Sequence, residues 1–413
     1  MNPLNIVFVF PYRGQGGVPF VFASIANYLS NHQLAKCFIV DYPDGSLASL
    51  IVPSVTLIPY SDDQCTSFPS NSLIVMQAMT PWSIYSGLLF NNSTRLFFWS
   101  LHPENFSPIT TPLIYKTLGR LPNFLQYIIY RPLKRQIISF LFCLMETKSL
   151  VFMDRTCAEN TRSTLALAKF NPTLLSVPLT IVPTSVIVSN TTHHSLPNPC
   201  PRFTWIGRLE EFKTFSLINF TSQLNALASS LGRILSINIV GYGSDKDLVF
   251  ESISKLSFLT FSYYSHIDSS ELGEFLLSTT DIAYSMGTSA LLSASIGIPT
   301  ILAPLCNHFI SDIVFYRWLH EYDGYTLGEY YDPTSIQQGK SLLELYNEFL
   351  NDVQRLSTQG SVYVHSNHSI DTVAGQLLAY AYRSSLYACD LRLINLIRKP
   401  FSYKLFHMVS KFI

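Results

Sequence analysis

The stretch YSMGTSALLSASIGIPTILAP (residues 284–304) decides the fold, because it contains a strand end, a tight turn, a helix and a second strand in that order. Gly287, Thr288 and Ser289 come directly before apolar residues at helical spacing. Their amides and hydroxyls can cap the N-terminus of that helix or bind a phosphate there. The stretch therefore has the framework of a site for a charged ligand, although it contains no Asp or Glu.

Strands and helices alternate on both sides of this stretch, and the candidate strands are apolar runs. In the first half they lie in residues 5–10, 36–45, 72–77, 95–100, 149–154 and 179–186. In the second half they lie in residues 203–209, 236–243, 259–265, 281–286 and 299–304, with a helix expected over 215–232. Continuous hydrophobicity is typical of parallel sheets covered on both faces. The sequence therefore predicts an α/β protein with two Rossmann-like, doubly wound domains.

A segment rich in Ser, Thr, Asn and Pro separates the two series of strands. It reads SNTTHHSLPNPCPR (residues 189–202) and has no apolar period, which is typical of a linker. We therefore expect a first domain over 1–189, a linker over 190–202, a second domain over 203–383 and a basic amphipathic segment over 384–413. Two such domains imply a cleft, with ligand at the carboxyl ends of the strands.

Composition limits the class of partner. The chain has 413 residues, with 27 Lys and Arg against 27 Asp and Glu, so it has no net charge that would attract nucleic acid. Its 7 cysteines form no C-x-x-C pair, and no D-x-D motif follows a strand in a suitable position. We therefore expect no nucleic-acid partner, no metal site and no cofactor.

Three segments of the second half, taken in order, resemble a known enzyme family. They are WIGRLEEFK, INIVGYGSD and TDIAYSMGTSALLSASIGIPTIL. Their order and spacing resemble the C-terminal domain of the large retaining family of GT-B glycosyltransferases, which includes glycogen-synthase-like and bacterial polysaccharide enzymes. The resemblance implies a GT-B fold whose C-terminal helix crosses back to the first domain, a nucleotide-sugar donor, and transfer of a hexose with retention.

Arg208 and Lys213 are the candidate catalytic residues of the second half. A nucleotide-sugar donor leaves as a diphosphate, and two cations beyond a strand end can neutralise the charge that develops on it without a metal. Arginine acts as a bidentate fork and lysine as a point charge. The alternative is an exposed pair that flanks a helix start and is balanced by Glu210 and Glu211.

Gly241 and Gly243 follow a predicted strand in the second half. Without a Cβ, both residues would let the backbone approach the donor nucleotide closely, or they would only form a tight turn. With Gly287, Thr288 and Ser289 they make up the predicted donor-binding set of this domain.

The resemblance also reveals what this chain lacks. The family has two glutamates separated by seven residues, of which the second holds the ribose hydroxyls and the first lies near the donor sugar. Counting back from Gly297 puts these positions at Tyr284 and Leu292. Three explanations are open: Ser289, Ser293 or the backbone holds the nucleoside, the donor differs, or the protein is a degenerate member. We favour a divergent active enzyme.

The first domain resembles the family over about its first fifty residues. GQGGVPFVFASIANYL is similar to the family's glycine-rich first loop and helix, where Gly16 and Gly17 would approach the donor phosphates or the acceptor. The spacing is not G-x-G-x-x-G, which argues against dinucleotide binding. In FFWSLHPENF, His102 follows a buried strand, where retaining GT-B enzymes often keep a histidine that faces the donor sugar. A structural histidine is the alternative, and Glu104 is a candidate base.

Two basic, aromatic-rich segments suggest contact with an anionic membrane surface. The first segment, residues 112–148, includes Arg131, Lys134 and Arg135, and the second runs from residue 384 to the end. Packing of their apolar faces between domains is the alternative. No apolar run reaches the roughly 18 residues of a spanning helix, and the N-terminus is typical of a core strand. We therefore expect a cytoplasmic protein, peripheral on the inner face of the inner membrane.

Together these features predict a glycosyltransferase of bacterial surface polysaccharide biosynthesis, in the O-antigen or capsule pathways. It would transfer a sugar from a nucleotide-diphosphate donor to a lipid-linked or polysaccharide acceptor. A transferase with a CMP-linked donor or a GT-B epimerase would hold the nucleoside differently and would explain the missing acids. A catalytically silent GT-B subunit that binds a partner enzyme is the third alternative.

Overall fold

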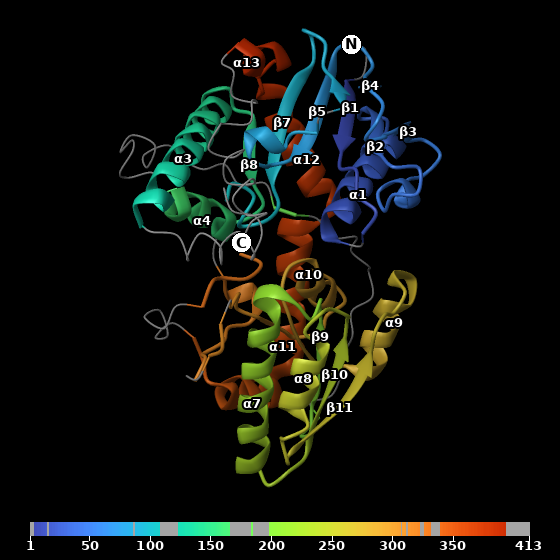
Figure 1. The fold of residues 1–413 in the computed structure, drawn as a ribbon. Coiled ribbons are helices and arrows are strands. Elements are labelled where there is room, and N and C mark those ends of the chain that lie inside the picture. The colour runs from blue at the N-terminus through green and yellow to red at the C-terminus, as the bar shows by residue number, and fades with distance from the viewer. Residues whose placement is uncertain are drawn as a thin grey trace. The chain divides into compact units, whose positions relative to one another are not determined.

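The computed structural model describes residues 4–14, 16–85, 87–107, 123–165, 183–184, 198–306, 308–310, 313–322, 326–331 and 339–393. The chain divides into two compact units (Figure 1). The first comprises Met1–Thr184 with Ile370–Ile413, and the second comprises Ser185–Ser369.

The first unit is built on a parallel six-stranded sheet in the order β3-β2-β1-β5-β7-β8. Its strands are β1 (Asn5–Val9), β2 (Lys36–Asp41), β3 (Thr56–Pro59), β5 (Ser72–Gln77), β7 (Arg95–Ser100) and β8 (Leu150–Phe152). Two short strands, β4 (Thr66–Ser67) and β6 (Leu88–Leu89), pair separately. All but the last of the strands expected in this half are confirmed, and β3 was not anticipated. The strand expected over 179–186 lies outside the described residues except for 183–184.

Helices cover both faces of this sheet, as its continuous apolar strands require. They are α1 (Gly17–Asn31), α3 (Asn123–Glu146), α4 (Arg155–Leu165), α12 (Ile370–Arg383) and α13 (Ala388–Leu393), with short helices η1 (Ala48–Leu50) and η2 (Pro81–Ser83). Successive strand residues alternate between two cores. Val7 and Val9 pack with α3 and α4, whereas Ile6 and Phe8 pack with α1 and α12.

The position of helix α12 differs from the predicted boundary at residue 383, where we expected the second domain to end. Its apolar face, which includes Val373 and Leu377, is buried in the core that α1 and the first sheet share. The chain therefore returns to the first unit at Ile370, inside the range expected for the second domain. The expectation that the C-terminal helix belongs with the first domain is confirmed. A helical period shows that one face is apolar, but it does not show which core buries that face.

Helix α3 contains most of the first predicted membrane segment. Ile137, Phe140 and Leu141 lie fully buried against the first sheet, so these three apolar residues of the segment are core residues. Arg131 and Arg135 are exposed, whereas the Nζ atom of Lys134 donates to Thr164 O (2.9 Å). Among the described residues, no helix is both long and apolar enough to cross a membrane. The predicted basic segment beyond residue 393 lies outside the described residues.

The second unit is built on a parallel five-stranded sheet in the order β11-β10-β9-β12-β13. Its strands are β9 (Arg202–Ile206), β10 (Leu235–Val240), β11 (Leu259–Tyr264), β12 (Ile282–Ser285) and β13 (Thr300–Leu302). Its helices are α7 (Thr214–Ser230), α8 (Lys246–Ile253), α9 (Ser269–Thr279), α10 (Thr288–Ser295) and α11 (Leu342–His368), with short helices η3 (Glu211–Lys213) and η4 (Leu319–Glu321). The strands and the helix expected in this half are confirmed. Helices α7 and α9 lie on opposite sides of this sheet (Figure 1).

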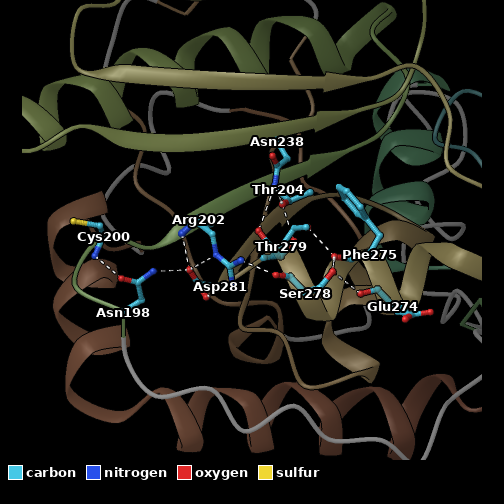
Figure 2. A network of polar contacts seen from close by, with 11 residues as sticks. Asn198, Cys200, Arg202, Thr204, Asn238, Glu274, Phe275, Ser278, Thr279 and Asp281 are labelled. Carbon is cyan, nitrogen blue, oxygen red and sulfur yellow. Dashed lines mark hydrogen bonds and ion pairs between the residues drawn. The ribbon is translucent and has the colours of Figure 1, made fainter.

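An ion pair between a buried aspartate and a partly exposed arginine joins two strands at the amino end of the second sheet (Figure 2). Asp281, directly before β12, accepts from the guanidinium of Arg202 (3.0 and 3.1 Å), from Arg202 N–H (2.8 Å) and from Asn198 (3.1 Å). Burial by itself would raise the pKa of Asp281. The hydrogen bonds from Arg202 and Asn198 outweigh burial and lower that pKa. Because 5% of the Asp281 side chain is exposed, the pair fixes how the chain enters β9 and β12.

Replacing Asp281 by Asn is expected to destabilise the protein by about 1–2 kcal/mol, because it weakens the hydrogen bonds that the buried carboxylate accepts, whereas the partly exposed Arg202 remains solvated. The folded pKa of Asp281 is lowered, so its contribution to stability is complete above the ordinary carboxyl pKa of about 4 and is lost as the pH falls through the folded pKa. Thermal melting at pH 7 measures the first effect. The exposed pair of Glu251 and Lys255 provides the control, and Glu251→Gln should melt like the wild type. Equal melting temperatures for Asp281→Asn and the wild type would contradict the assignment.

Candidate functional site

The carboxyl edge of the second sheet has a topological switch point between β9 and β12, where the strand order reverses. Ile206 pairs with Ser285 there, so the segments that follow these two residues start side by side. The first segment includes Arg208 and Lys213, and the second leads through Gly287 to the start of α10. Ligands of open α/β sheets bind in such a crevice. The fold therefore brings the predicted cations and the Gly287–Ser289 turn to one edge.

The two cations lie on a loop that is held by its neighbours. Arg208 forms an ion pair with Glu210, as the structural alternative expected, and both side chains remain partly exposed. Lys213 ends η3 and is half-buried, and the next residue, Thr214, donates its hydroxyl to Asp245 (2.9 Å). Cys306 N–H donates to Phe212 O (2.9 Å), which joins this loop to the segment that follows β13. Hydrogen bonds to two neighbouring segments therefore hold the loop that carries Arg208 and Lys213.

Gly241 and Gly243 adopt φ values of 147° and 158°. A Cβ on Gly241 would lie 2.0 Å from Gly207 O, and one on Gly243 would lie 2.3 Å from Leu209 O. Gly207 N–H also donates to Val240 O (3.0 Å), so a hydrogen bond joins the same two segments. Close contact between two protein segments thus accounts for both glycines.

The start of α10 leaves polar groups for a ligand. Gly287, with φ 65° and ψ −145°, precedes the helix and provides no side-chain cap, and its own N–H donates to Leu327 O (2.9 Å). The hydroxyls of Ser285 and Thr326 are buried and have no hydrogen-bond partner within the described ranges. Unsatisfied buried hydroxyls beside a helix N-terminus are typical of a place where a bound anion or water completes the network.

In the first unit, Gly16 and Gly17 lie exposed at the start of α1, beyond the carboxyl end of β1. Gly16 is extended, with φ −178° and ψ 167°, a conformation open to any residue. The nearest atom to a Cβ placed there would be 3.8 Å away. The structure therefore gives no steric reason for glycine at position 16.

His102 and Glu104 lie in a turn after β7. Glu104 N–H donates to His102 Nδ1 (3.1 Å), and the Asn105 side chain accepts from the N–H groups of Leu101 (3.0 Å) and His102 (2.9 Å). His102 is half-buried, and the hydrogen bond from Glu104 N–H orients its imidazole. His102 therefore has a defined structural role in the turn, which leaves a role toward the donor sugar as a proposal.

Asp41 is a structural residue that the sequence analysis missed. Its buried carboxylate at the end of β2 accepts from the backbone N–H groups of Tyr12, Tyr42, Leu47 and Ala48 (2.8 to 3.0 Å). Acids at the ends of Rossmann strands can hold ribose. Here four amides already engage the carboxylate, so Asp41 fixes the loop before α1. An acid at the end of an apolar strand was the available signal.

No protein family model and no curated protein matches the sequence. Among solved structures, the chain is similar to a glycosyltransferase from Rickettsia africae ESF-5 at 12% identity and TM-score 0.54, with 93% of this chain and 99% of that chain covered. It is also similar to the N-terminal domain of the Candida albicans trehalose-6-phosphate phosphatase at 10% identity and TM-score 0.54, with 92% and 97% covered. The fold is that of the GT-B glycosyltransferases. One of the two similar structures belongs to a phosphatase, and a fold alone does not decide an activity.

The GT-B resemblance placed the two missing acids at Tyr284 and Leu292, and both side chains pack against the core of the second unit. Tyr284 lies inside β12, fully buried, stacked on Phe220 (ring centroids 3.7 Å apart) and hydrogen-bonded to the Ser216 hydroxyl (2.6 Å). This burial raises its pKa above the usual tyrosine value. Leu292 packs against the same core.

The connection between β12 and α10 is short and contains no acid. Only Met286 and Gly287 lie between the end of β12 and the start of α10. Ser293, a candidate for holding ribose, is buried and donates to Ser289 O (3.1 Å) within the helix, so its hydroxyl is already engaged. Among the described side chains, no group of three His, Cys, Asp or Glu is placed to hold a metal ion.

Proposed function

We propose that this protein is a glycosyltransferase that moves a hexose from a nucleotide-diphosphate donor to a lipid-linked or polysaccharide acceptor, as in the assembly of bacterial surface polysaccharides. One observation carries the proposal: Arg208, Lys213 and the start of α10 lie at the topological switch point of the second sheet. Cations and a helix N-terminus at one strand edge suit a diphosphate.

The proposed chemistry follows from those groups. The bond between the sugar C1 and the donor phosphate breaks, the oxygen of an acceptor hydroxyl forms the new bond to C1, and the proton of that hydroxyl passes to the phosphate oxygen that leaves C1. The diphosphate gains negative charge as it leaves, and Arg208 and Lys213 would stabilise that charge. The amides that open α10 would hold a phosphate oxygen, with the Ser285 and Thr326 hydroxyls beside them. Retention of configuration and a role for His102 at the donor sugar belong to the same proposal.

Calorimetry with UDP, GDP, ADP and CMP tests the proposal. Selective binding of one nucleoside diphosphate is the expected result. Selective CMP binding would instead favour the transferase with a CMP-linked donor. Absence of binding by all four nucleotides would overturn the enzyme proposal and favour a catalytically silent subunit.

Turnover is expected to be independent of divalent metal, because two protein cations would supply the charge that Mg²⁺ or Mn²⁺ supplies elsewhere. Release of the diphosphate from the selected nucleotide sugar, measured with and without EDTA, checks this. Loss of activity in EDTA that Mg²⁺ or Mn²⁺ restores would show that the charge assignment is wrong.

Ile137, Phe140 and Leu141 of α3 are core residues, so the proposed peripheral membrane contact of the described part of this helix would rest on its exposed basic residues. Each cation near an anionic surface contributes about 1 kcal/mol, an attraction that salt screens. Replacing the exposed Arg131 and Arg135 by Glu is therefore expected to release the protein from anionic vesicles at low salt, as measured by co-sedimentation. The exposed Lys255→Glu variant is the control and should remain bound. A wild type that ignores these vesicles would leave the two arginines as an ordinary solvated face.

A further inference from the structure

Tyr242 is an exposed aromatic residue at the carboxyl edge of the second sheet. It lies between Gly241 and Gly243, directly beyond β10, and 43% of the residue is exposed. Tyr264 ends the neighbouring strand β11 and is 36% exposed, and Gly241 N–H donates to Tyr264 O (2.9 Å). Two tyrosines therefore mark the ends of adjacent strands at the edge where Arg208 lies.

The backbone that presents Tyr242 is rigidly attached to the Arg208 loop. Leu209 N–H donates to Tyr242 O (2.8 Å), and Asp245 N–H donates to Leu209 O (2.9 Å). Because the flanking glycines allow this approach, Tyr242 is bonded to the residue that directly follows Arg208. Tyr264 is braced in turn by an edge-to-face contact with Phe275 (4.9 Å, 69°). An aromatic ring on a fixed backbone loses little freedom when a ligand stacks on it.

A nucleoside bound at this edge would have to be bound by a group other than a carboxylate. The β12–α10 connection has no acid, and two acids of the neighbouring loops already have partners: Glu210 pairs with Arg208, and Asp245 accepts from Thr214. Stacking of a base on an aromatic ring requires no carboxylate and contributes about 1–3 kcal/mol, which corresponds to roughly 5- to 150-fold in affinity.

From this geometry we propose that Tyr242 stacks on the base of the nucleoside diphosphate and so binds the nucleoside in place of the missing acids. The inference rests on the proposed function and adds a binding residue to it. With the phosphates at Arg208 and α10, the base lies toward β10 and β11.

Calorimetry on the full chain, with the diphosphate selected from UDP, GDP and ADP and with inorganic pyrophosphate, tests the role of the ring. Tyr242→Ala is expected to lower the affinity for the nucleoside diphosphate roughly 5- to 150-fold. Its affinity for pyrophosphate should be unchanged, because pyrophosphate has no base. Tyr242→Phe should retain wild-type affinity, because the stacking face persists. Phe258→Ala is the matched control: Phe258, 38% exposed, lies at the amino end of β11, away from this edge.

The outcomes separate this inference from the function on which it rests. If the wild type binds none of the diphosphates, both the proposed function and the role of Tyr242 are overturned. If the wild type binds one and Tyr242→Ala binds it equally well, the role of Tyr242 alone is overturned. The role of Tyr242 is also overturned if Tyr242→Ala lowers the affinity for pyrophosphate as much as the affinity for the nucleotide, because the ring then only maintains the loop.

Discussion

Replacing Arg208 by Ala is expected to lower turnover about a hundredfold or more, with a smaller change in donor affinity. The guanidinium would act mainly on charge that develops as the diphosphate leaves, so its removal would raise the barrier more than it weakens the ground state. Release of the diphosphate from the selected donor under saturating conditions measures the effect. Lys213→Ala should behave alike, because it removes the second charge from the same loop.

Two comparisons make this result specific. Lys255→Ala removes an exposed cation from the turn after α8 and should leave turnover unchanged. Glu210→Gln removes the partner of Arg208 in the ion pair while the guanidinium stays, so its turnover should exceed that of Arg208→Ala. Wild-type rates in both Arg208→Ala and Lys213→Ala would eliminate these residues as stabilisers of the leaving group.

Replacing Gly241 by Ala is expected to destabilise the second unit by about 3 kcal/mol or more. The new Cβ would lie 2.0 Å from Gly207 O and 2.9 Å from Gly207 C, both of which are backbone atoms, and the residue would have to keep φ 147°. The β9 and β10 loops would have to separate, which would also displace Arg208. Thermal melting and the affinity for the selected diphosphate measure the two effects.

Gly273→Ala is the matched control for this substitution. Gly273 lies inside α9, and a Cβ there would meet nothing within 4 Å. Alanine favours a helix interior by about 0.5–1 kcal/mol over glycine, so this variant should melt at or slightly above the wild-type temperature. If Gly241→Ala and Gly273→Ala melt alike, the close approach of the two loops is not required for stability.

The sequence by itself determined the two parallel sheets, because each buried strand is a local apolar run between turn residues. The runs at 72–77 and 95–100 coincide with β5 and β7. It also indicated the edge that holds Arg208, Lys213 and Gly287, because residues after parallel strands must lie at the same end of a sheet. The absence of acids from residues 284–304 was likewise readable directly.

Only the tertiary structure decided which groups are already engaged. Asp41 accepts from four amides, Tyr284 is stacked in the core, and Ile137, Phe140 and Leu141 of α3 lie against the first sheet. It also decided that α12 belongs to the first unit and that Gly241 and Gly243 serve the approach of two loops. These outcomes depend on contacts between segments far apart in the chain, and a local pattern specifies that a face is apolar or a carboxylate present without specifying its partner.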